Sequence, residues 1–288
     1  MSRKENLMAK TKKVASPTAG QPLPPIPAGL GLPFYYSSLS NCEILYLVDA
    51  AVAASYLKET GLELATFDGK ACVSFNHQLY TAQFPSGASI TQEIELNILS
   101  YPASLGGMVA SVSFEQFVLG DEQSKILGNH RVWVPCDADL AIKAGKELFG
   151  EPKFKTSFTI SIPSPNDTTV TTWSFTCQDP TNEKIAVFTC TADLRGLDPI
   201  LSNPAPHTEY GTFGGRLIGC RWNVLSPYQT CFLGTDARKR VKLTIGKSGH
   251  PMAADMKALI GSTPAAAVRT FQSAAAATQS RAYYPVAK

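Results

Sequence analysis

The stretch that decides the fold is Ala141-Ile142-Lys143-Ala144-Gly145-Lys146-Glu147-Leu148-Phe149-Gly150-Glu151-Pro152-Lys153-Phe154. Its first part has the composition of a helix, which we expect over residues 137–148 with Gly150 as its stop. Pro152 cannot continue that helix, so Lys153 begins a new strand. A lysine held there can lose its hydration, which lowers its pKa and makes its amine a nucleophile toward carbonyl carbon.

The residues after the turn predict how this lysine is surrounded. Side chains alternate along a strand, so Lys153 and Lys155 should share a face, with Cα atoms about 6–7 Å apart. Two ammonium groups in one poorly solvated cavity disfavour each other's charge. Lowering a lysine pKa from about 10 to about 7 takes about 4 kcal/mol, which desolvation and one like charge can supply. We therefore expect Lys153 as a nucleophile of lowered pKa, with Lys155 and Phe154 beside the substrate.

Most of the remaining chain has the pattern of short strands. Two further helices are expected, at residues 49–61 behind the capping residue Asp49 and at residues 251–260. Strands are expected at residues 71–80, 89–100, 108–119, 154–162, 170–177, 184–193, 217–225, 230–233 and 241–245. Short turns between successive strands favour antiparallel pairing, and this many strands favours a closed barrel or a sandwich. The region after Thr263 fits a helix or a strand.

Residues 1–33 differ in composition from the rest of the chain. Residues 1–13 contain five basic side chains and one acidic one, and residues 17–33 are rich in proline. We expect this leader to be disordered and residues 34–288 to fold as a single domain. Because the leader holds more positive charge than the net +3 of the whole chain, the remainder is close to neutral. A basic face for nucleic acid is therefore not expected.

The composition also bears on compartment and cofactors. The 288 residues are 44% hydrophobic and 17% charged, which suits a globular protein with a full core. No apolar run approaches the ~20 residues of a membrane helix, and no secretory signal is recognisable. The seven cysteines form no Cys-x-x-Cys pair, and the four histidines lack metal-ligand spacing. We expect a cytoplasmic protein with free thiols, no metal, and no membrane partner.

The opening stretch resembles the signature of the acetoacetate decarboxylase family. In that family a helix ends in Ala-Ile-x-x-Gly-Arg-Glu-Leu, and a short turn then leads to Pro-Lys-Lys. Residues 141–148 correspond to the helix and residues 152–154 to the Pro-Lys-Lys segment. Ile44-Leu45-Tyr46 before Asp49 is similar to the family's first strand and helix. The resemblance implies an α+β, mainly β fold: a closed antiparallel β-barrel with a few peripheral helices, assembled as a homo-oligomer.

The resemblance further implies a lysine Schiff-base lyase acting on a small-molecule keto acid. Lys153 would form an iminium that serves as the electron sink for decarboxylation of a β-keto acid, with no cofactor. The family also places a glutamate beside the lysine. Counting forward from Asp49 indicates Glu93, and counting back from Lys153 indicates Glu115. Both glutamates are candidates for orienting the substrate or moving protons.

Three positions depart from the family pattern. The second lysine of the motif is Phe154, the helix arginine is Lys146, and the arginine after the first strand's tyrosine is Leu47. Loss of the arginine favours an alternative reaction, that of an aldolase-dehydratase or related C–C lyase on a larger keto acid. A second alternative is a non-catalytic small-molecule-binding barrel in which Lys153 anchors a carboxylate.

Overall fold

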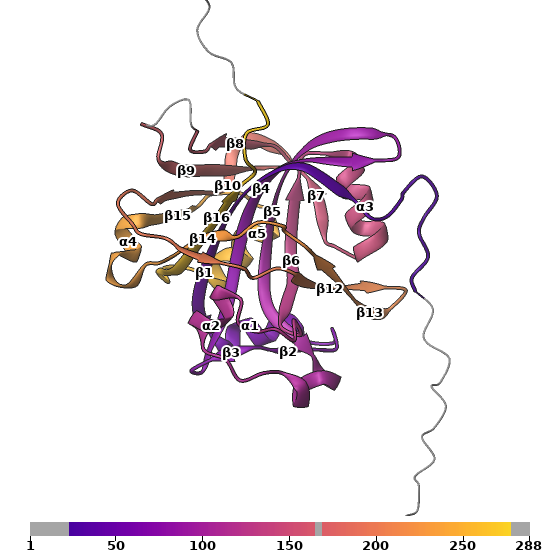
Figure 1. Ribbon diagram of the computed structural model, residues 1–288, viewed down its shortest axis with the longest axis horizontal. Coiled ribbons are helices and arrows are strands. Elements are labelled where there is room, and N and C mark those ends of the chain that lie inside the picture. The colour runs from indigo at the N-terminus through magenta and orange to yellow at the C-terminus, as the bar shows by residue number, and fades with distance from the viewer. Residues whose placement is uncertain (1–22, 165–168, 278–288) are drawn as a thin grey trace, which may run out of the picture.

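The computed structural model describes residues 23–164 and 169–277. Within these ranges the chain forms a twelve-stranded sheet, a four-stranded sheet and short helices (Figure 1). The larger sheet contains β1 (Tyr35–Asp49), β2 (Leu62–Leu64), β3 (Thr66–Phe67), β4 (Lys70–Phe84), β5 (Gly87–Pro102), β6 (Gly128–Cys136), β7 (Lys153–Lys155), β11 (Ile200–Ser202), β12 (His207–Phe213), β13 (Arg216–Trp222), β14 (Tyr228–Phe232) and β16 (Ala265–Gln272). The smaller sheet contains β8 (Phe158–Ser161), β9 (Thr172–Asp179), β10 (Asn182–Asp193) and β15 (Val241–Ile245). The helical elements are α1 (Ala50–Ala54), α2 (Phe114–Leu119), α3 (Asp139–Phe149), α4 (Ala237–Arg240), α5 (Pro251–Leu259), and the 3-10 turns η1 (Ser55–Leu57), η2 (Ala103–Met108) and η3 (Gly234–Asp236).

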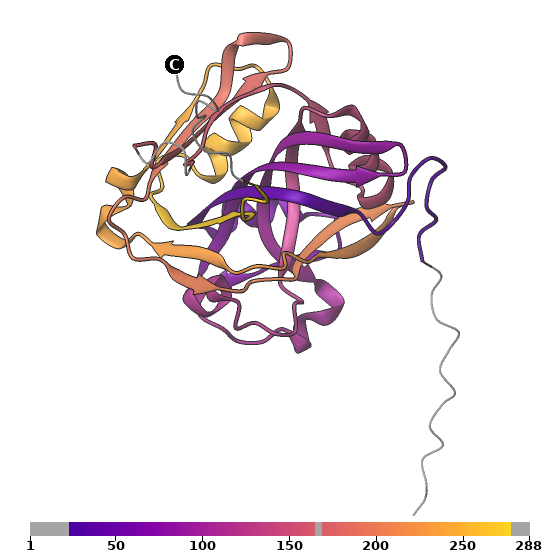
Figure 2. The same ribbon diagram turned by 45° about the horizontal axis from the view of Figure 1, so that its top comes forward.

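The mainly β, α+β class is confirmed, but the pairing differs from the expected closed antiparallel barrel. The larger sheet has the order β11-β14-β16-β1-β4-β5-β6-β12-β13, with β2, β3 and β7 paired at its side. Among the described strands, no ladder joins the two ends of this order, β11 and β13. β6 pairs in parallel with both β12 and β7. The sheet curls around an interior (Figure 2), and its closure into a barrel stays a prediction.

The two faces of the curled sheet bury different kinds of side chain. Successive side chains of a strand point to opposite faces. On β4, Phe75 faces the smaller sheet and contacts Phe175 and Phe188 at ring-centroid distances of 6.1 Å and 5.3 Å. The alternate residues of β4 and β5 are buried polar side chains, namely Asn76, Gln78, Glu93, Glu95 and Asn97. The interior of the curled sheet is therefore polar, while its outer face belongs to the main hydrophobic core.

His77 of β4 lies in that core, and its burial predicts that acid destabilises the protein. Its ring stacks on Phe175 at a centroid distance of 5.1 Å. Burial lowers the pKa of His77 to about 4. The unfolded chain takes up this proton near its ordinary pKa of about 6.5, so the His77 contribution to stability is complete above that pH and is lost as the pH falls toward 4.

We expect His77→Phe to remove this pH dependence. The loss in the unaltered protein between about pH 7 and about pH 4 is on the order of 3 kcal/mol, because each pKa unit corresponds to about 1.4 kcal/mol. Urea unfolding at the two pH values measures it. An unchanged pH dependence in the variant would assign the acid sensitivity to other groups.

Several elements lie where the sequence predicts them. Asp49 caps α1, and its carboxylate accepts from the backbone N–H of Ala51 at 2.7 Å. Residues 241–245 form β15, and the ambiguous region after Thr263 forms the strand β16. All seven cysteines are free thiols. No helix in the described ranges is both long enough and apolar enough to cross a membrane.

Other predictions fail for identifiable reasons. The strand expected at residues 108–119 is wrong, because Ser113 and Gln116 form a capping box that starts α2. The strands β6 and β12 were not predicted at all. Both carry charged residues facing the interior, Arg131 on β6 and Glu209 on β12, which break the apolar pattern that marks a strand.

Candidate active site

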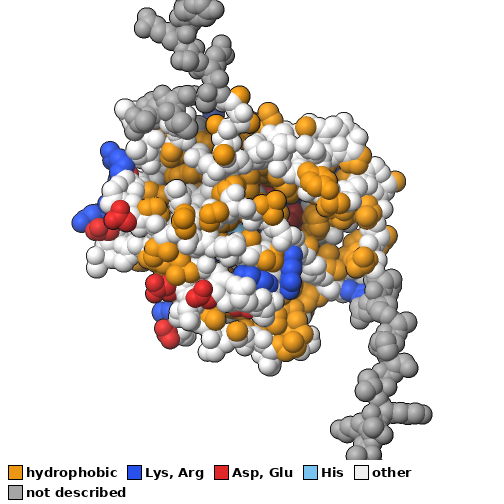
Figure 3. Space-filling view, in the orientation of Figure 1, with side chains coloured by type: hydrophobic (Ala, Val, Ile, Leu, Met, Phe, Trp, Pro, Cys, Tyr) orange, Lys and Arg blue, Asp and Glu red, His pale blue; other side chains and the backbone are white. Residues whose placement is uncertain are grey.

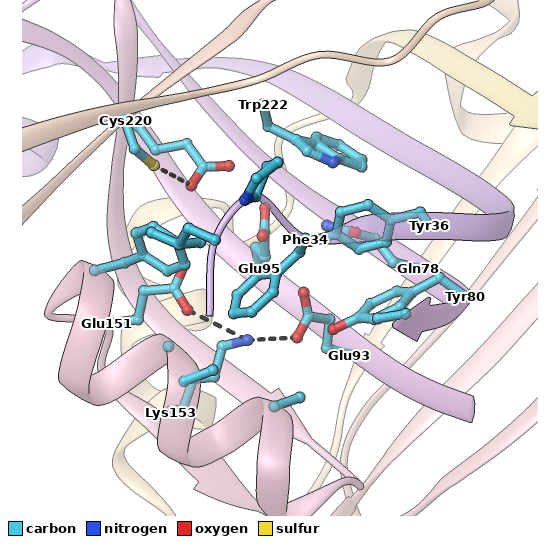
Figure 4. A pocket seen from close by; sticks show the side chains of 18 of the residues that line it. Phe34, Tyr36, Gln78, Tyr80, Glu93, Glu95, Glu151, Lys153, Cys220 and Trp222 are labelled. Atoms are coloured by element: carbon cyan, nitrogen blue, oxygen red, sulfur yellow. Dashed lines mark hydrogen bonds and ion pairs between the residues drawn. The ribbon is translucent and has the colours of Figure 1, made fainter. Parts of the chain in front are cut away.

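The polar interior opens into a cavity of about 560 Å³. Its wall is made by β1, β4, β5, β6, β7, β12 and β13, by α3, and by the chain that precedes β1. Figure 4 shows the side chains that face it, with Lys153 and two glutamates at one end and Trp222 and Cys220 at the other. Charged side chains are scattered over the face drawn in Figure 3, whereas six charged side chains form one connected group around the cavity.

Lys153 is fixed by the turn that follows α3. The helix ends at Gly150, whose φ of 64° lets the chain reverse. A Cβ on Gly150 would collide with the backbone of Thr212, and a Cβ on Gly211 with the backbone of Phe149, so the helix end presses against β12. β7 then pairs with β6, and Lys153 lies opposite Val134. The amine is therefore presented by a paired strand rather than by a mobile loop.

The amine of Lys153 lies between two carboxylates. Its Nζ is 2.6 Å from Oε2 of Glu93 and 3.2 Å from Oε2 of Glu151 (Figure 4). The residue is 7% exposed. Burial lowers the pKa of Lys153, but Glu151 and Glu93 together raise it by more, so the net pKa is well above the ordinary value. Lys153 is consequently an ammonium ion at neutral pH.

The expected lowering of the Lys153 pKa by Lys155 is therefore wrong. Lys155 is exposed, and its Nζ donates to Oδ1 of Asp139 at 2.9 Å and to the carbonyl of Asp137 at 2.6 Å. It does not line the cavity. β7 has only three residues, and its last residue already lies at the surface. Side chains do alternate along β7, but the strand is too short for Lys155 to reach the cavity.

Arg131 holds three of the glutamates together. Its Nη2 is 2.7 Å from Glu95 Oε1 and 2.5 Å from Glu209 Oε1, and its Nε is 3.1 Å from Glu151 Oε1. Burial raises the pKa of Glu151, but the positive charges of Lys153 and Arg131 lower it by more, and the net pKa is below the ordinary value. Glu151 thus stays ionised between two cations.

Glu95 and Glu209 share the remaining positive charge of Arg131. Burial raises the pKa of Glu95 to about 8, because the attraction of Arg131 is smaller than the cost of desolvation. Burial also raises the pKa of Glu209 against the same attraction. The amide of Asn76 donates to Glu95 Oε2 at 2.9 Å. Burial therefore favours a protonated Glu95, beside the ionised Glu151 and the Lys153 ammonium.

A glycine of α3 makes room for the lysine side chain. Gly145 faces Lys153, and a Cβ built on it would lie 2.5 Å from Cε and 2.6 Å from Cδ of that lysine. The same Cβ would lie closer still to Oε2 of Glu151, so any larger residue would force both side chains to shift. The conformation of Lys153 therefore depends on a residue of the same opening stretch, eight positions earlier in the chain.

The structure brings two of the predicted site residues together and leaves three outside. Lys153 meets Glu93, which is 5% exposed and lines the cavity. Glu115 is exposed on α2 and does not line it. Phe154 turns away and stacks on His250 at a centroid distance of 4.1 Å. Together with Lys155, these last two were wrongly placed at the site.

Leu47 is not part of the cavity either. It packs in a separate hydrophobic cluster with Phe67 and Leu99. A leucine at this position therefore removes no positive charge from the cavity. The cation that the sequence reading missed is Arg131. The missed acids are Glu95, Glu151 and Glu209. Glu151 lies in the opening stretch, and Glu95 shares one face of β5 with Glu93. No group of three or more His, Cys, Asp or Glu side chains in the described ranges is arranged to hold a metal ion.

The end of the predicted leader belongs to the cavity wall. Leu30 is 9% exposed, and Leu32, Pro33 and Phe34 line the cavity. The Phe34 ring packs against Phe84 at a centroid distance of 5.1 Å. Packing therefore begins before residue 34, and the disorder expected for residues 1–22 concerns a part of the chain outside the described ranges.

Comparisons with known proteins identify similar structures but no similar sequence family. No family model and no curated protein matches this chain. The enduracididine biosynthesis enzyme MppR, in its complex with pyruvate, aligns with a TM-score of 0.54 and 14% identity over 88% of each chain. The acetoacetate decarboxylase of Legionella pneumophila aligns at 0.53 and 11% over 87% of each chain. An acetoacetate decarboxylase-like enzyme of Sphingomonas wittichii aligns at 0.52 and 14%, over 82% of this chain and 87% of that one.

These likenesses define the class of fold. The chain has the fold of acetoacetate decarboxylase and its structural relatives, as the resemblance of the opening stretch implied. The solved structures that share it here are enzymes.

Proposed function

We propose that this protein is a lyase that forms a Schiff base between Lys153 and a keto acid. One observation carries the proposal: a buried lysine amine faces a 560 Å³ cavity and lies between the carboxylates of Glu93 and Glu151. A buried lysine is rare unless it is paired, and a paired one beside an open cavity is typical of a functional site. The fold shared with a decarboxylase and with a pyruvate-binding enzyme supports the same chemistry.

The first step must remove a proton from Lys153. Its ammonium cannot attack a carbonyl, and Glu93 accepts its hydrogen bond at 2.6 Å. Glu93 is therefore the base that takes the proton when a ketone enters. The free amine forms a C–N bond to the ketone carbon, and the carbonyl oxygen leaves as water after receiving two protons. The product is an iminium cation on Lys153, whose charge the ionised Glu151 stabilises.

The iminium then accepts electrons from a neighbouring bond. In a β-keto acid the bond to the carboxylate breaks, CO₂ leaves, and the electron pair forms an enamine. A proton added to the enamine carbon restores an iminium, and water releases the ketone and the lysine. The proton on Glu95, at a pKa of about 8, is a second acid in the same wall of the cavity.

The size of the cavity favours a second candidate reaction. A volume of 560 Å³ is in the range of roughly 300–1,000 Å³ that holds drug-sized ligands, well above the needs of a four-carbon acid. An aldolase-dehydratase would use the same enamine to attack an aldehyde and would need this space. MppR has been solved with a condensation product of pyruvate and imidazole 4-carboxaldehyde, at a TM-score of 0.52 to this chain.

Imine trapping with borohydride tests the proposal. The protein is incubated with acetoacetate, and separately with pyruvate, and the adduct is located by peptide mass spectrometry. We expect the adduct on Lys153. Release of CO₂ from acetoacetate would identify the decarboxylase, and a condensation product from pyruvate with an added aldehyde would identify the aldolase-dehydratase. Adducts spread over surface lysines would instead favour a non-catalytic binding protein.

Glu93→Gln tests the role of the base. Because the amide cannot accept the lysine proton, we expect trapping to slow about a hundredfold. Glu115→Gln is the matched control, since it makes the same chemical change on the exposed face of α2. Equal trapping rates for the two variants would show that Glu93 is not the base.

A further inference from the structure

We propose that the substrate carries a cationic group, such as an ammonium, guanidinium or imidazolium, at the end remote from its reacting carbonyl. This inference rests on the proposed function, because it assumes that the carbonyl binds Lys153. It concerns the other end of the cavity, where Glu209, Cys220 and Trp222 lie (Figure 4).

The buried cations around the cavity are already paired. Four acidic side chains line it, those of Glu93, Glu95, Glu151 and Glu209. Lys153 and Arg131, the two buried cations of the wall, are both held in ion pairs with these acids. Arg221 also borders the cavity, but it is exposed and its Nη2 donates to the carbonyl of Ser124. An anionic substrate end would therefore find no unpaired buried cation in the described wall.

Glu209 is the acid best placed to receive a cation. It shares Arg131 with Glu95 and Glu151, and its side chain is 13% exposed against 6% and 9% for theirs. Its second oxygen, Oε2, accepts from the thiol of Cys220 at 3.2 Å. A thiol is a weak donor, so this carboxylate oxygen is poorly satisfied without a ligand. A cationic group in the cavity would supply the missing donor.

Aromatic rings surround the same end of the cavity. Trp222 and Tyr36 line it, and their ring centroids are 6.1 Å apart. Figure 4 shows the Trp222 ring at the side of the cavity away from Lys153, with the Tyr36 ring between Trp222 and Glu93. The face of an aromatic ring attracts a cation, and indole does so most strongly. A carboxylate beside two rings is thus suited to a cation and poorly suited to a second carboxylate.

A set of three methyl ketones of equal length tests the inference on the full chain. One ends in a trimethylammonium group, one in the isosteric tert-butyl group, and one in a carboxylate. Each is trapped with borohydride, and the adduct on Lys153 is quantified against time by mass spectrometry at low substrate concentration. We expect the cationic ketone to label Lys153 at least about tenfold faster than the tert-butyl ketone, and the anionic ketone to be slowest.

Two variants test the residues. Glu209→Gln and Trp222→Leu should each bring the ratio of cationic to neutral labelling close to one, whereas Glu115→Gln should keep the ratio of the unaltered protein. The ratio is its own control for folding, because a folding defect lowers the labelling by all three ketones alike. Equal labelling by the three ketones, or preference for the anionic one, overturns the inference and leaves the Schiff-base proposal standing. No labelling of Lys153 by any ketone overturns both.

Discussion

Lys153→Met is expected to abolish imine trapping and turnover and also to destabilise the protein. The methionine cannot form an imine, so the trapped adduct should be absent from the peptide that contains residue 153. Removing one partner of a buried ion pair leaves carboxylates without a countercharge, which costs about 3 kcal/mol or more. Mass spectrometry of the trapped protein and urea unfolding measure the two effects.

The loss of stability in Lys153→Met should depend on pH. Lys153 is the foremost charge that lowers the pKa of Glu151, against the burial that raises it. Without the lysine, the folded-state pKa of Glu151 rises toward the value that burial favours. A group whose folded pKa is raised loses its stabilising contribution as the pH rises. We therefore expect the deficit to be larger at about pH 8 than at about pH 5.

Lys155→Met is the matched control for this prediction. Lys155 is two residues away, on the same strand, and pairs with Asp139 at the surface. Exposed ion pairs contribute about 1 kcal/mol or less, so this variant should unfold nearly as the unaltered protein does. It should also trap the imine at the normal rate. A Lys155→Met variant without an adduct would mean that the wrong lysine has been identified.

Gly145→Ala is expected to have the second largest effect. Its Cβ would lie 2.5 Å from Cε of Lys153, and no carbon pair tolerates that distance. The lysine stem must move by roughly 1 Å, and a displacement of that size can cost about a hundredfold in rate. Alanine favours a helix by about 1 kcal/mol over glycine, but overpacking costs about 1–3 kcal/mol, so the net effect on stability should be a small loss.

The rate of imine trapping measures this effect, and urea unfolding measures the stability. Gly107→Ala is the control, since nothing lies within 4 Å of a Cβ at that position. A Gly145→Ala variant that traps the imine within twofold of the unaltered rate would show that Lys153 can approach a ketone from another conformation.

The local part of the site could be predicted from the sequence because its cause is local. The helix, the left-handed Gly150, the turn at Pro152 and the start of a strand at Lys153 all follow from neighbouring residues. The Asp49 cap and the strands with clear alternation follow in the same way. These features depend on local backbone preferences, which do not require contacts with distant parts of the fold.

The charge environment of the lysine could not be predicted, because it depends on pairing between distant segments. Arg131 and Glu209 meet only because β6 and β12 pair in parallel across many intervening residues. Because these charged residues interrupt the apolar alternation of their segments, neither the two strands nor their site residues were predicted. The direction of the Lys153 pKa shift depends on which charged residues share its cavity. The sequence pattern predicted Lys155 there, whereas the fold places Glu93 and Glu151 beside the amine.

The segment that precedes β1 has a consequence for how this protein can change over evolutionary time. Leu32 and Pro33 form part of the cavity wall, yet they belong to no strand and bear none of the sheet's pairing. Substitutions or length changes there can reshape the volume offered to a substrate at little cost to folding, because loops tolerate variation that paired strands do not. The reaction proposed at Lys153 can thus stay fixed while the range of accepted molecules changes.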